Sequence, residues 1–409
     1  MAANNAPPND YLEEHAEFFN EIFNDDDSGE EFDGFDPEDI VNEEIEDQED
    51  NVVEWTVGDR DPPTLNFTGN PGLVRDVPDK NSPLDYFSLF VDDDACSQMA
   101  DETNRYADQY LESRELPVKS RFRKWVATTA NEIRLFLSLI LAMGLVSQLD
   151  VTEYWTTDPV TSTPFFPAIM ARDRFLLILT FLHLNDNSRY IPRGQPGYEP
   201  LYKLGDLFKL IIANFGRVYY PHQEIALDEG MVPWRGNLSF RVYNPDKPTK
   251  YGIKAYMICD AVIGYCSKFK LYTGKPANPP SHNGATYHLT MDLMRGFFGR
   301  GHILYCDNYY SSPQLFLDLW ELGVGATGTV RPNRKGIPQL IKDARLPHKG
   351  DIAVANCGTL SVTKYHNSKM VLLLSTVSSS ELIGELTYIY KVKHTCNHTC
   401  KTFMKKLFD

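Results

Sequence analysis

The sequence predicts an α/β protein with a mixed sheet, preceded by an all-helical region and by a disordered acidic arm. Acidic residues dominate the beginning of the chain, and apolar residues then recur at helical spacing from residue 82 to residue 222. From Gln223 onward, short apolar runs that read as strands alternate with helices. Neighbouring strands followed by alternating helices and strands are typical of an α/β arrangement with a mixed sheet.

Charge is distributed unevenly along the chain. Residues 1–61 contain 23 Asp and Glu against one basic residue, Arg60, which is a balance of −22. Because the whole chain carries −16, the remaining 348 residues carry +6. We expect residues 1–80 to form a disordered arm and linker that packs little against the body, since acidic runs bury too little apolar surface. The basic body indicates a nucleic-acid partner.

Hydropathy and cysteine usage exclude several classes of protein. The first 20 residues are polar and lack the apolar stretch of a signal peptide. The most apolar stretch, residues 135–146, has 12 residues, whereas a membrane span needs about 20. The seven cysteines are scattered and lie mostly in apolar runs, which favours free thiols in a reducing compartment. We therefore expect an intracellular protein without a membrane segment.

The helical region begins at a recognisable cap. Ser82 and Pro83 are typical of the N-cap and first position of a helix. Residues 133–145 are apolar nearly all round, so we expect this helix to sit inside a bundle. Residues 172–184 and 201–215 read as two further helices.

After Gln223 the apolar residues follow the spacing of strands. The expected strands are residues 224–228, 251–261, 268–273, 301–306 and 325–330. Residues 286–298 read as a helix, and Ser312-Pro313 predicts the start of another, which ends before Gly323.

Two aspartates lie at equivalent places in this pattern. Asp228 ends the first strand and Asp307 ends the fourth. Sites in open α/β sheets gather at the carboxyl ends of strands, so both side chains could reach one crevice. Two adjacent carboxylates repel each other unless a cation such as Mg²⁺ lies between them. The alternative is that both residues only end strands and start turns, and spacing alone favours that alternative.

From residue 82 to residue 376 a series of longer motifs follows in order. They include SPLDYFSLF, WVATTANEIRLFLSLILAMGL, ARDRFLLILTFLHLND, IALDEGMVPWRG, YNPDKPTKYGIKAYMICD, HILYCDNYYSSPQLF, GTVRPNRKGIP and MVLLLST. On these stretches the chain resembles the transposase domain of the piggyBac family. The resemblance implies an RNase H-like core with three aspartates that hold Mg²⁺ or Mn²⁺. It also implies double-stranded DNA as a partner, either transposon ends or genomic DNA, and a nuclear location.

The resemblance assigns two of the three aspartates. Asp228 matches the first through LDEGM, and Asp307 matches the second through CDNYYSS. The third follows a Gly-Gly-Val motif beyond MVLLLST in the family, and no such motif follows Ser378 here. The acidic residues of the tail, Glu381, Glu385 and Asp409, do not match it. A smaller departure is Gly236-Asn237, where the family more often has Gly-Arg.

We therefore expect a domesticated or truncated transposase in which DNA cleavage and strand transfer are impaired. The alternative is a non-catalytic DNA-binding or chromatin-associated factor that keeps the fold. The oligomeric state is left open, with a homodimer as one alternative.

Basic residues near the two aspartates are candidates for contacts with DNA phosphates, because Lys and Arg supply most of the affinity for nucleic acid. The candidates are Lys250, Lys254, Arg331, Arg334 and Lys335, of which the last three lie in GTVRPNRKGIP. For Lys247, an ordinary surface position is the favoured interpretation.

The end of the chain carries four residues that could bind zinc, namely His394, Cys396, His398 and Cys400. Their alternation at every second residue does not fit the paired knuckles of zinc sites, and it does not reproduce the family's cysteine-rich zinc domain. We expect no zinc site there.

The organisation that follows has five parts. They are residues 1–80, the acidic arm and linker; 81–222, the helical domain; 223–335, the RNase H-like core; 336–380, the start of an insertion region; and 381–409, a divergent tail.

Overall fold

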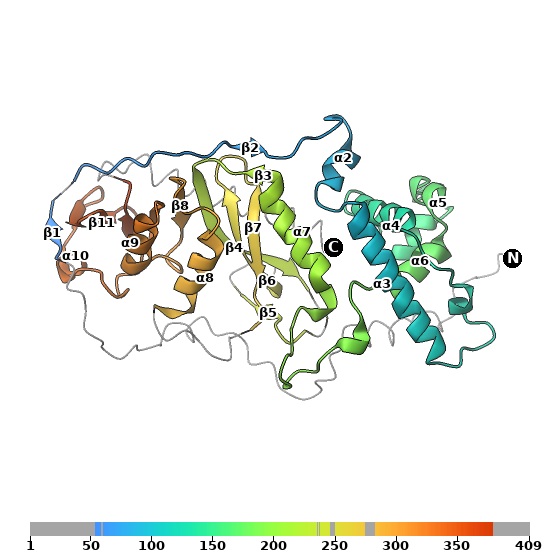
Figure 1. Cartoon of the computed structure of the whole chain (residues 1–409). Helices are drawn as coiled ribbons and strands as arrows, with labels where there is room; N and C mark the ends of the chain where they lie inside the picture. Colours follow the sequence, from blue (N-terminus) through green and yellow to red (C-terminus); the bar gives the residue numbers. More distant parts are fainter. Residues whose placement is uncertain are drawn as a thin grey trace.

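A mixed β-sheet forms the centre of the molecule (Figure 1). The computed structural model of the chain describes residues 54–58, 60–234, 236, 238–245, 250–274 and 283–378. Within these residues the sheet has ten strands in the order β1-β10-β11-β12-β9-β8-β4-β6-β5, with β7 paired to β6. Its strands are β1 (Thr56–Val57), β4 (Glu224–Pro233), β5 (Val242–Tyr243), β6 (Tyr251–Asp260), β7 (Cys266–Leu271), β8 (Ile303–Cys306), β9 (Gly325–Thr329), β10 (Ile352–Cys357), β11 (Leu360–His366) and β12 (Met370–Ser375).

The middle of the sheet is parallel and its flanks are antiparallel. Strand β8 pairs in parallel with β4 on one side and with β9 on the other. The remaining pairs in this sheet are antiparallel. Parallel neighbours need crossover connections, and α8 (Gly284–Met294) and α9 (Pro313–Glu321) lie in those connections. The expected mixed sheet is therefore confirmed.

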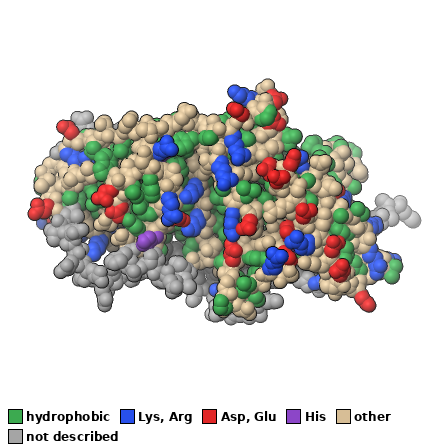
Figure 2. All heavy atoms as spheres, in the orientation of Figure 1, with side chains coloured by type: hydrophobic (Ala, Val, Ile, Leu, Met, Phe, Trp, Pro, Cys, Tyr) green, Lys and Arg blue, Asp and Glu red, His purple; other side chains and the backbone are tan. Residues whose placement is uncertain are grey.

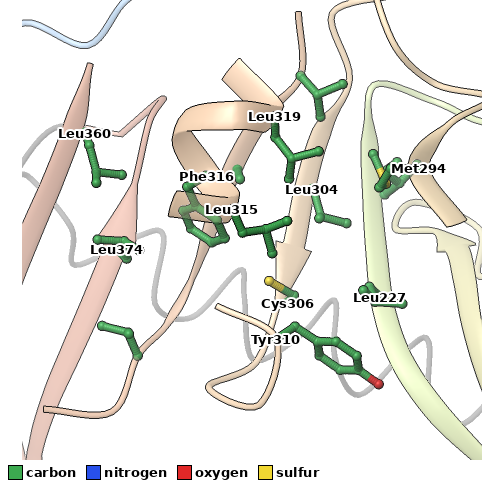
Figure 3. Packing of buried hydrophobic residues seen from close by; sticks show 14 of the residues in the cluster. Leu227, Met294, Leu304, Cys306, Tyr310, Leu315, Phe316, Leu319, Leu360 and Leu374 are labelled. Atoms are coloured by element: carbon green, nitrogen blue, oxygen red, sulfur yellow. The ribbon is translucent and has the colours of Figure 1, made fainter. Parts of the chain in front are cut away.

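The two faces of the sheet carry separate apolar clusters, because side chains alternate along a strand. On one face, Leu227 and Leu304 pack with Leu315 and Phe316 of α9, as Figure 3 shows. On the other face, Ala226 packs in a cluster with residues of α7 (Gly205–Val218). Seen from the side of α7 and α8, Lys and Arg side chains gather over the middle of the molecule (Figure 2).

The helices that precede the sheet follow the capping signals of the sequence. They are α2 (Pro83–Ser88), α3 (Asp93–Glu112), α4 (Ala130–Met143), α5 (Phe165–Ile169) and α6 (Arg172–Phe181), with short 3₁₀ turns between them. The Ser82 hydroxyl accepts a hydrogen bond from the Asp85 amide, so it caps α2 as expected. Phe136 of α4 and Phe175 of α6 are fully buried in the cluster that joins these helices.

Helix α4 is less enclosed than its sequence suggested. Ile133, Phe136 and Leu139 are buried, but Leu135 and Leu141 are 46% and 44% exposed. One face of the helix packs and the other does not, so the expectation of a helix surrounded by a bundle is corrected. Among the residues that the structure describes, no helix is long and apolar enough to cross a membrane.

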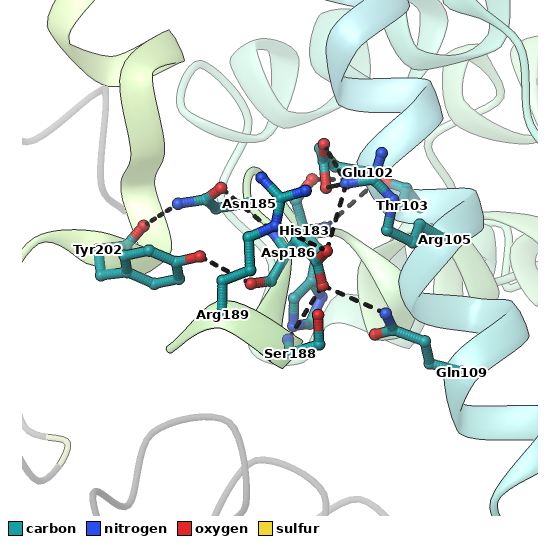
Figure 4. A network of polar contacts seen from close by, with 10 residues as sticks. All are labelled: Glu102, Thr103, Arg105, Gln109, His183, Asn185, Asp186, Ser188, Arg189 and Tyr202. Atoms are coloured by element: carbon teal, nitrogen blue, oxygen red, sulfur yellow. Dashed lines mark hydrogen bonds and ion pairs between the residues drawn. The ribbon is translucent and has the colours of Figure 1, made fainter. Parts of the chain in front are cut away.

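A polar network fixes the segment that leads from α6 toward α7 (Figure 4). The ring of His183 stacks on the ring of Tyr106 in α3, with 3.4 Å between the ring centres. Burial lowers the pKa of His183 to about 4. The carboxylate of Asp186 accepts hydrogen bonds from the Ser188 amide at 3.0 Å and from the Gln109 amide side chain at 3.2 Å. The Ser188 hydroxyl has the largest effect on the pKa of Asp186, and together with the Ser188 amide and Gln109 it lowers this pKa to about 2. The network therefore holds this segment against α3.

Residues 54–58 and 60–80, which we call the N-terminal strap, run along the sheet (Figure 1). We expected residues 1–80 to pack little against the body, but the strap differs. Strand β1 pairs with β10, β2 (Gly72–Leu73) pairs with β3 (Tyr219–Tyr220), and the Thr68 amide donates to the Arg300 carbonyl at 3.0 Å. The guanidinium of Arg60 donates to the Thr376 carbonyl at 3.1 Å. An extended segment whose backbone groups pair with the body needs no core of its own. Residues 1–53 lie outside the described residues.

The region after β9 also differs from the sequence analysis, which assigned no strands to residues 336–380. Strands β10, β11 and β12 form an antiparallel meander there, and β12 joins it to β9 through Leu373–Thr329, Leu374–Gly328 and Ser375–Thr327. Leu372 and Leu374 are buried in the cluster that also contains α9. This meander extends the central sheet.

Close contact between the strap and the body predicts a specific sensitivity at Gly301. This glycine has φ of +78°, and a Cβ there would clash with the carbonyl of Asn66 in the strap. Gly350 also has positive φ, +99°, but a Cβ there would meet no atom within 4 Å. We expect Gly301→Ala to lower the free energy of unfolding more than Gly350→Ala does, by a difference of about 1 kcal/mol or more. Urea unfolding of both variants measures this, and equal losses would show that the strap does not lie against Gly301.

Asp260, at the end of β6, is a buried polar anchor. It is 0% exposed, and its carboxylate accepts hydrogen bonds from the amides of His222 at 2.9 Å, Val262 at 2.7 Å and Ile263 at 3.1 Å. Burial raises the pKa of this carboxyl, but the hydrogen bonds from His222, Ile263 and Val262 outweigh burial and leave the pKa below its usual value.

The lowered pKa of Asp260 predicts a pH dependence of stability. The pKa in the unfolded chain is about 3.9, so the ionised carboxylate stabilises the fold above that pH. Its contribution is lost as the pH falls through the lower pKa of the folded state. We expect Asp260→Asn to cost about 1–3 kcal/mol at neutral pH and to flatten the loss of stability below about pH 4. Urea unfolding from pH 7 to pH 3 tests this beside Asp101→Asn at an exposed position. An unchanged slope for Asp260→Asn would contradict it.

Candidate functional site

Parallel pairing of β4 with β8 brings the two aspartates together. The register runs from Glu224–Ile303 to Leu227–Cys306, and Asp228 and Asp307 are the next residue on each side. Neighbouring strands lie about 4.8 Å apart, and residues in register on parallel strands face the same side. The register therefore places the backbones of Asp228 and Asp307 next to each other where β8 ends. The expectation that Asp228 ends its strand is corrected, because β4 continues to Pro233.

The two aspartates sit in different local settings. Asp228 lies within β4, is 5% exposed, and accepts a hydrogen bond from the Glu229 amide at 2.9 Å. Asp307 is half-buried and begins a turn over residues 307–311, which we call the Asp307 turn. Its carboxylate accepts from the Tyr309 amide at 2.9 Å, and its carbonyl accepts from the Ser311 hydroxyl at 2.9 Å. Asp228 is thus fixed by the sheet and Asp307 by a turn.

The Asp307 turn packs closely against β9. Gly328 of β9 pairs with Cys306, and a Cβ at this glycine would clash with the Cys306 carbonyl and the Ser311 hydroxyl. Ser312 then caps α9 by accepting from the Leu315 amide at 3.3 Å. The turn therefore has little freedom on its β9 side, because only a residue without a side chain leaves room for it.

A third carboxylate, which the sequence analysis did not single out, lies beside the pair. Glu229 follows Asp228 in LDEGM, so strand alternation places its side chain on the opposite face of β4. There it accepts a hydrogen bond from the Tyr310 hydroxyl at 3.0 Å, and Tyr310 is 2% exposed. The available signal was a second carboxylate that interrupts an apolar strand. Because it faces away from Asp228, Glu229 is not a substitute for the missing metal ligand.

Buried tyrosines surround Glu229. Burial raises the pKa of Tyr310 well above its usual value, and the charges of Glu229, Asp228 and Asp307 raise it further. Burial also raises the pKa of Tyr256, and the neighbouring Tyr309 raises it further. Tyr256 lies opposite Glu229 in the pairing of β4 with β6. Tyr256 and Tyr310 therefore stay neutral, and the Tyr310 hydroxyl remains a hydrogen-bond donor to Glu229.

The structure changes the interpretation of two basic candidates. Lys254 is only 7% exposed, and its ammonium lies 4.9 Å from the ring centre of Tyr256 and 5.1 Å from that of Tyr309. Strand alternation turns it into the tyrosine cluster, so the expectation that it contacts DNA is corrected. The guanidinium of Arg334 donates to the carbonyls of Asn308 at 2.7 Å and Tyr309 at 3.0 Å, so it supports the Asp307 turn.

The other candidates occupy more open positions. Lys250 and Lys335 are exposed, and Arg331 is half-buried. Several residues discussed from the sequence lie outside the described residues. They are Asn237, Lys247, Glu381, Glu385, His394, Cys396, His398, Cys400 and Asp409.

Two adjacent carboxylates fit a hard divalent ion. Mg²⁺ is commonly held by one or two carboxylates, with water and substrate phosphate completing its octahedron. Asp228 and Asp307 are two carboxylates of the kind that such an ion prefers. Within residues 54–378, as far as they are described, no group of three or more His, Cys, Asp or Glu side chains is arranged to hold a metal. The described residues thus fit one ion more readily than the two-ion centre of phosphoryl-transfer enzymes.

Comparison with known proteins gives consistent matches. A family model described as Transposase IS4 matches residues 82–402. Human PiggyBac transposable element-derived protein 2 is 26% identical over 340 residues, which cover 80% of this chain and 54% of that protein. Human PiggyBac transposable element-derived protein 3 is 27% identical over 277 residues, which cover 66% of this chain and 43% of that protein. The chain spans about half the length of the curated relatives it matches.

A solved structure also resembles this chain. The cryo-EM structure of a piggyBac transposase synaptic complex with hairpin DNA aligns with a TM-score of 0.70 and 26% sequence identity. The alignment covers 80% of this chain and 69% of that one. The arrangement of strands and helices described above is therefore shared with that transposase.

Proposed function

We propose that this chain, which belongs to the piggyBac family of transposases matched by the Transposase IS4 model, binds double-stranded DNA through its transposase domain. We further propose that strand cleavage and strand transfer by this domain are impaired. We assign residues 81–222 to a helical domain and residues 223–335 to an RNase H-like core. A nuclear location and a homodimer belong to the same proposal.

The parallel register of β4 and β8 carries this proposal, because it sets Asp228 beside Asp307. These two carboxylates would hold Mg²⁺ or Mn²⁺. When bound, such an ion activates a water or a 3′-hydroxyl and stabilises the leaving oxygen of a phosphodiester. The protein's own part is to hold both carboxylates in position beside the DNA backbone. The sheet holds Asp228 in place, and the Asp307 turn holds its partner.

We propose that strand cleavage is impaired because phosphoryl transfer requires that both the attacking and the leaving oxygen be held in position. Two carboxylates provide too few fixed oxygens for a second ion, and the described residues supply no third ligand. This observation also favours the second candidate function, a non-catalytic DNA-binding or chromatin-associated factor. Both candidates require DNA binding, and cleavage distinguishes them.

Affinity for DNA is supported by charge. The chain beyond residue 61 carries a net +6, and Lys and Arg side chains gather over the middle of the face shown in Figure 2. The similar transposase was solved with hairpin DNA. Exposed basic side chains such as Lys250 and Lys335 are suited to contact phosphates without reading sequence.

The first test is strand cleavage in Mn²⁺, the more permissive ion. We expect the full chain to nick a plasmid that carries terminal repeats no faster than its Asp228→Ala variant, because the second ion lacks fixed ligands. Gel separation of nicked and supercoiled plasmid measures this. Cleavage that disappears in Asp228→Ala would overturn the proposed impairment, and Glu381 and Glu385 would then be the first residues to substitute in search of a third ligand.

The second test is DNA binding as a function of salt. We expect affinity for duplex DNA to fall steeply as salt rises, because bound Lys and Arg release counterions from the phosphates. Lys250→Ala and Lys335→Ala should each weaken binding and reduce the slope of log K against log salt by about 1. Lys254→Ala should leave both unchanged in the folded protein, since this ammonium is buried. Fluorescence anisotropy measures all three, and a loss in Lys254→Ala equal to that in Lys335→Ala would contradict the assignment.

A further inference from the structure

The Asp307 turn depends on restraints from outside the strand ladder. The β4–β8 ladder ends at Leu227 and Cys306, one residue before the two aspartates. Asp228 remains in place because β4 continues to pair with β6 through Pro233. Asp307 has left its strand, so the position of its carboxylate relative to Asp228 depends on whatever holds the turn.

We propose that Glu229 and Tyr310 are positioning residues whose hydrogen bond sets the separation of the Asp228 and Asp307 carboxylates. The inference rests on the proposed function, in which these two aspartates share a metal ion. Both residues lie on the face of β4 opposite Asp228, so they act through the position of the Asp307 turn.

Sequence adjacency makes this hydrogen bond an effective tie. Glu229 is the neighbour of Asp228, and Tyr310 belongs to the same turn as Asp307. A bond of 3.0 Å between the Tyr310 hydroxyl and the Glu229 carboxylate therefore joins the two backbones that carry the aspartates. Tyr310 is 2% exposed, so water competes poorly for its hydroxyl. The tie lies on the opposite face of β4 from Asp228, so it leaves the space in front of the carboxylates open.

Both ends of the tie are themselves anchored. Glu229 lies opposite Tyr256 in the ladder between β4 and β6, which fixes its backbone. The ring of Tyr310 packs in the apolar cluster with Leu315 and Phe316 of α9. Figure 3 shows this ring beside Cys306 and Leu227. A hydrogen bond between two fixed groups transmits position, whereas a bond between mobile groups does not.

A second restraint holds the turn from its other side. The guanidinium of Arg334 donates to the carbonyls of Asn308 and Tyr309. Loss of the Glu229–Tyr310 bond should therefore loosen the turn without unfolding it. That expectation makes the inference measurable in folded protein.

The competing explanation is that Tyr310 only fills the core and Glu229 is incidental. Tyr310→Phe keeps the ring and removes the hydroxyl. Glu229→Gln keeps an oxygen that accepts the hydrogen bond, whereas Glu229→Ala removes it. Tyr265→Phe is the matched control, because the Tyr265 hydroxyl donates to the Phe215 carbonyl at 2.9 Å in the cluster on the other face of the sheet.

The experiment measures Mn²⁺ affinity by electron paramagnetic resonance of free Mn²⁺ in titrations of the full chain. We expect Tyr310→Phe and Glu229→Ala to bind Mn²⁺ about tenfold more weakly, as is common when a partner outside the ligand shell is lost. Glu229→Gln should stay within about threefold of the unsubstituted chain, and Tyr265→Phe should not change. Equal weakening in Glu229→Gln and Glu229→Ala, or in Tyr265→Phe and Tyr310→Phe, would overturn the inference.

A metal-free readout separates this inference from the proposed function. Hydrogen exchange of the Tyr310 and Ser311 amides, which donate to the Asp307 carbonyl, reports the stability of the turn. We expect faster exchange in Tyr310→Phe and Glu229→Ala and no change in Tyr265→Phe. If Asp228→Asn binds Mn²⁺ as well as the unsubstituted chain, the proposed metal site fails, while faster exchange still supports the tie. Unchanged exchange overturns the tie whatever the Mn²⁺ titration shows.

Discussion

The parallel, in-register pairing of β4 with β8 is the constraint on which the rest of the structure depends. It requires a crossover between the strands, and the β6–β7 hairpin and α8 lie in that connection. It places β8 between β4 and β9, so α9 must return the chain beside the sheet. It also brings Asp228 next to Asp307 from opposite ends of that crossover. The chemistry of the site is therefore a consequence of sheet order, and any change of register would separate the carboxylates.

Segments far from this pair complete the sheet around it. The meander of β10, β11 and β12 continues the sheet beyond β9, and the N-terminal strap pairs with β10. Arg60 in the strap donates to the carbonyls of Thr359 and Thr376, so one guanidinium joins the first described segment to the last strands. These additions support the parallel centre without reaching the carboxylates. The acidic composition of the arm was therefore a poor guide to the strap, because pairing through the backbone does not depend on apolar content.

Elements with local signals could be predicted from the sequence, and those set by distant partners could not. Ser82 and Ser312 indicated the starts of α2 and α9, because a serine side chain can cap the first turn of a helix. Asp228 and Asp307 were candidates because each follows an apolar run, and the resemblance through LDEGM and CDNYYSS then assigned them to the site. The strands β10 to β12 were missed because their stability comes from pairing with one another and with β9. Lys254 was placed at a surface because a lysine is usually exposed, whereas tyrosines brought from other parts of the chain cover it. Glu229 could not be assigned a role from the sequence, because its partner Tyr310 lies 81 residues away in the chain.

The polar groups of the site are partnered by the protein itself. Asp228 accepts from the Glu229 amide, Asp307 from the Tyr309 amide, and Glu229 from the Tyr310 hydroxyl. Each of these bonds offsets part of the cost of burying a carboxylate. Hydrogen bonds within the chain can therefore maintain the shape of this site whether or not DNA is cleaved. In this chain the geometry around Asp228 and Asp307 is thus compatible with either candidate function. The two candidate functions differ in whether a third fixed oxygen completes the ligand set of the metal site. That ligand would position the phosphate, and it would not be needed for the stability of the fold.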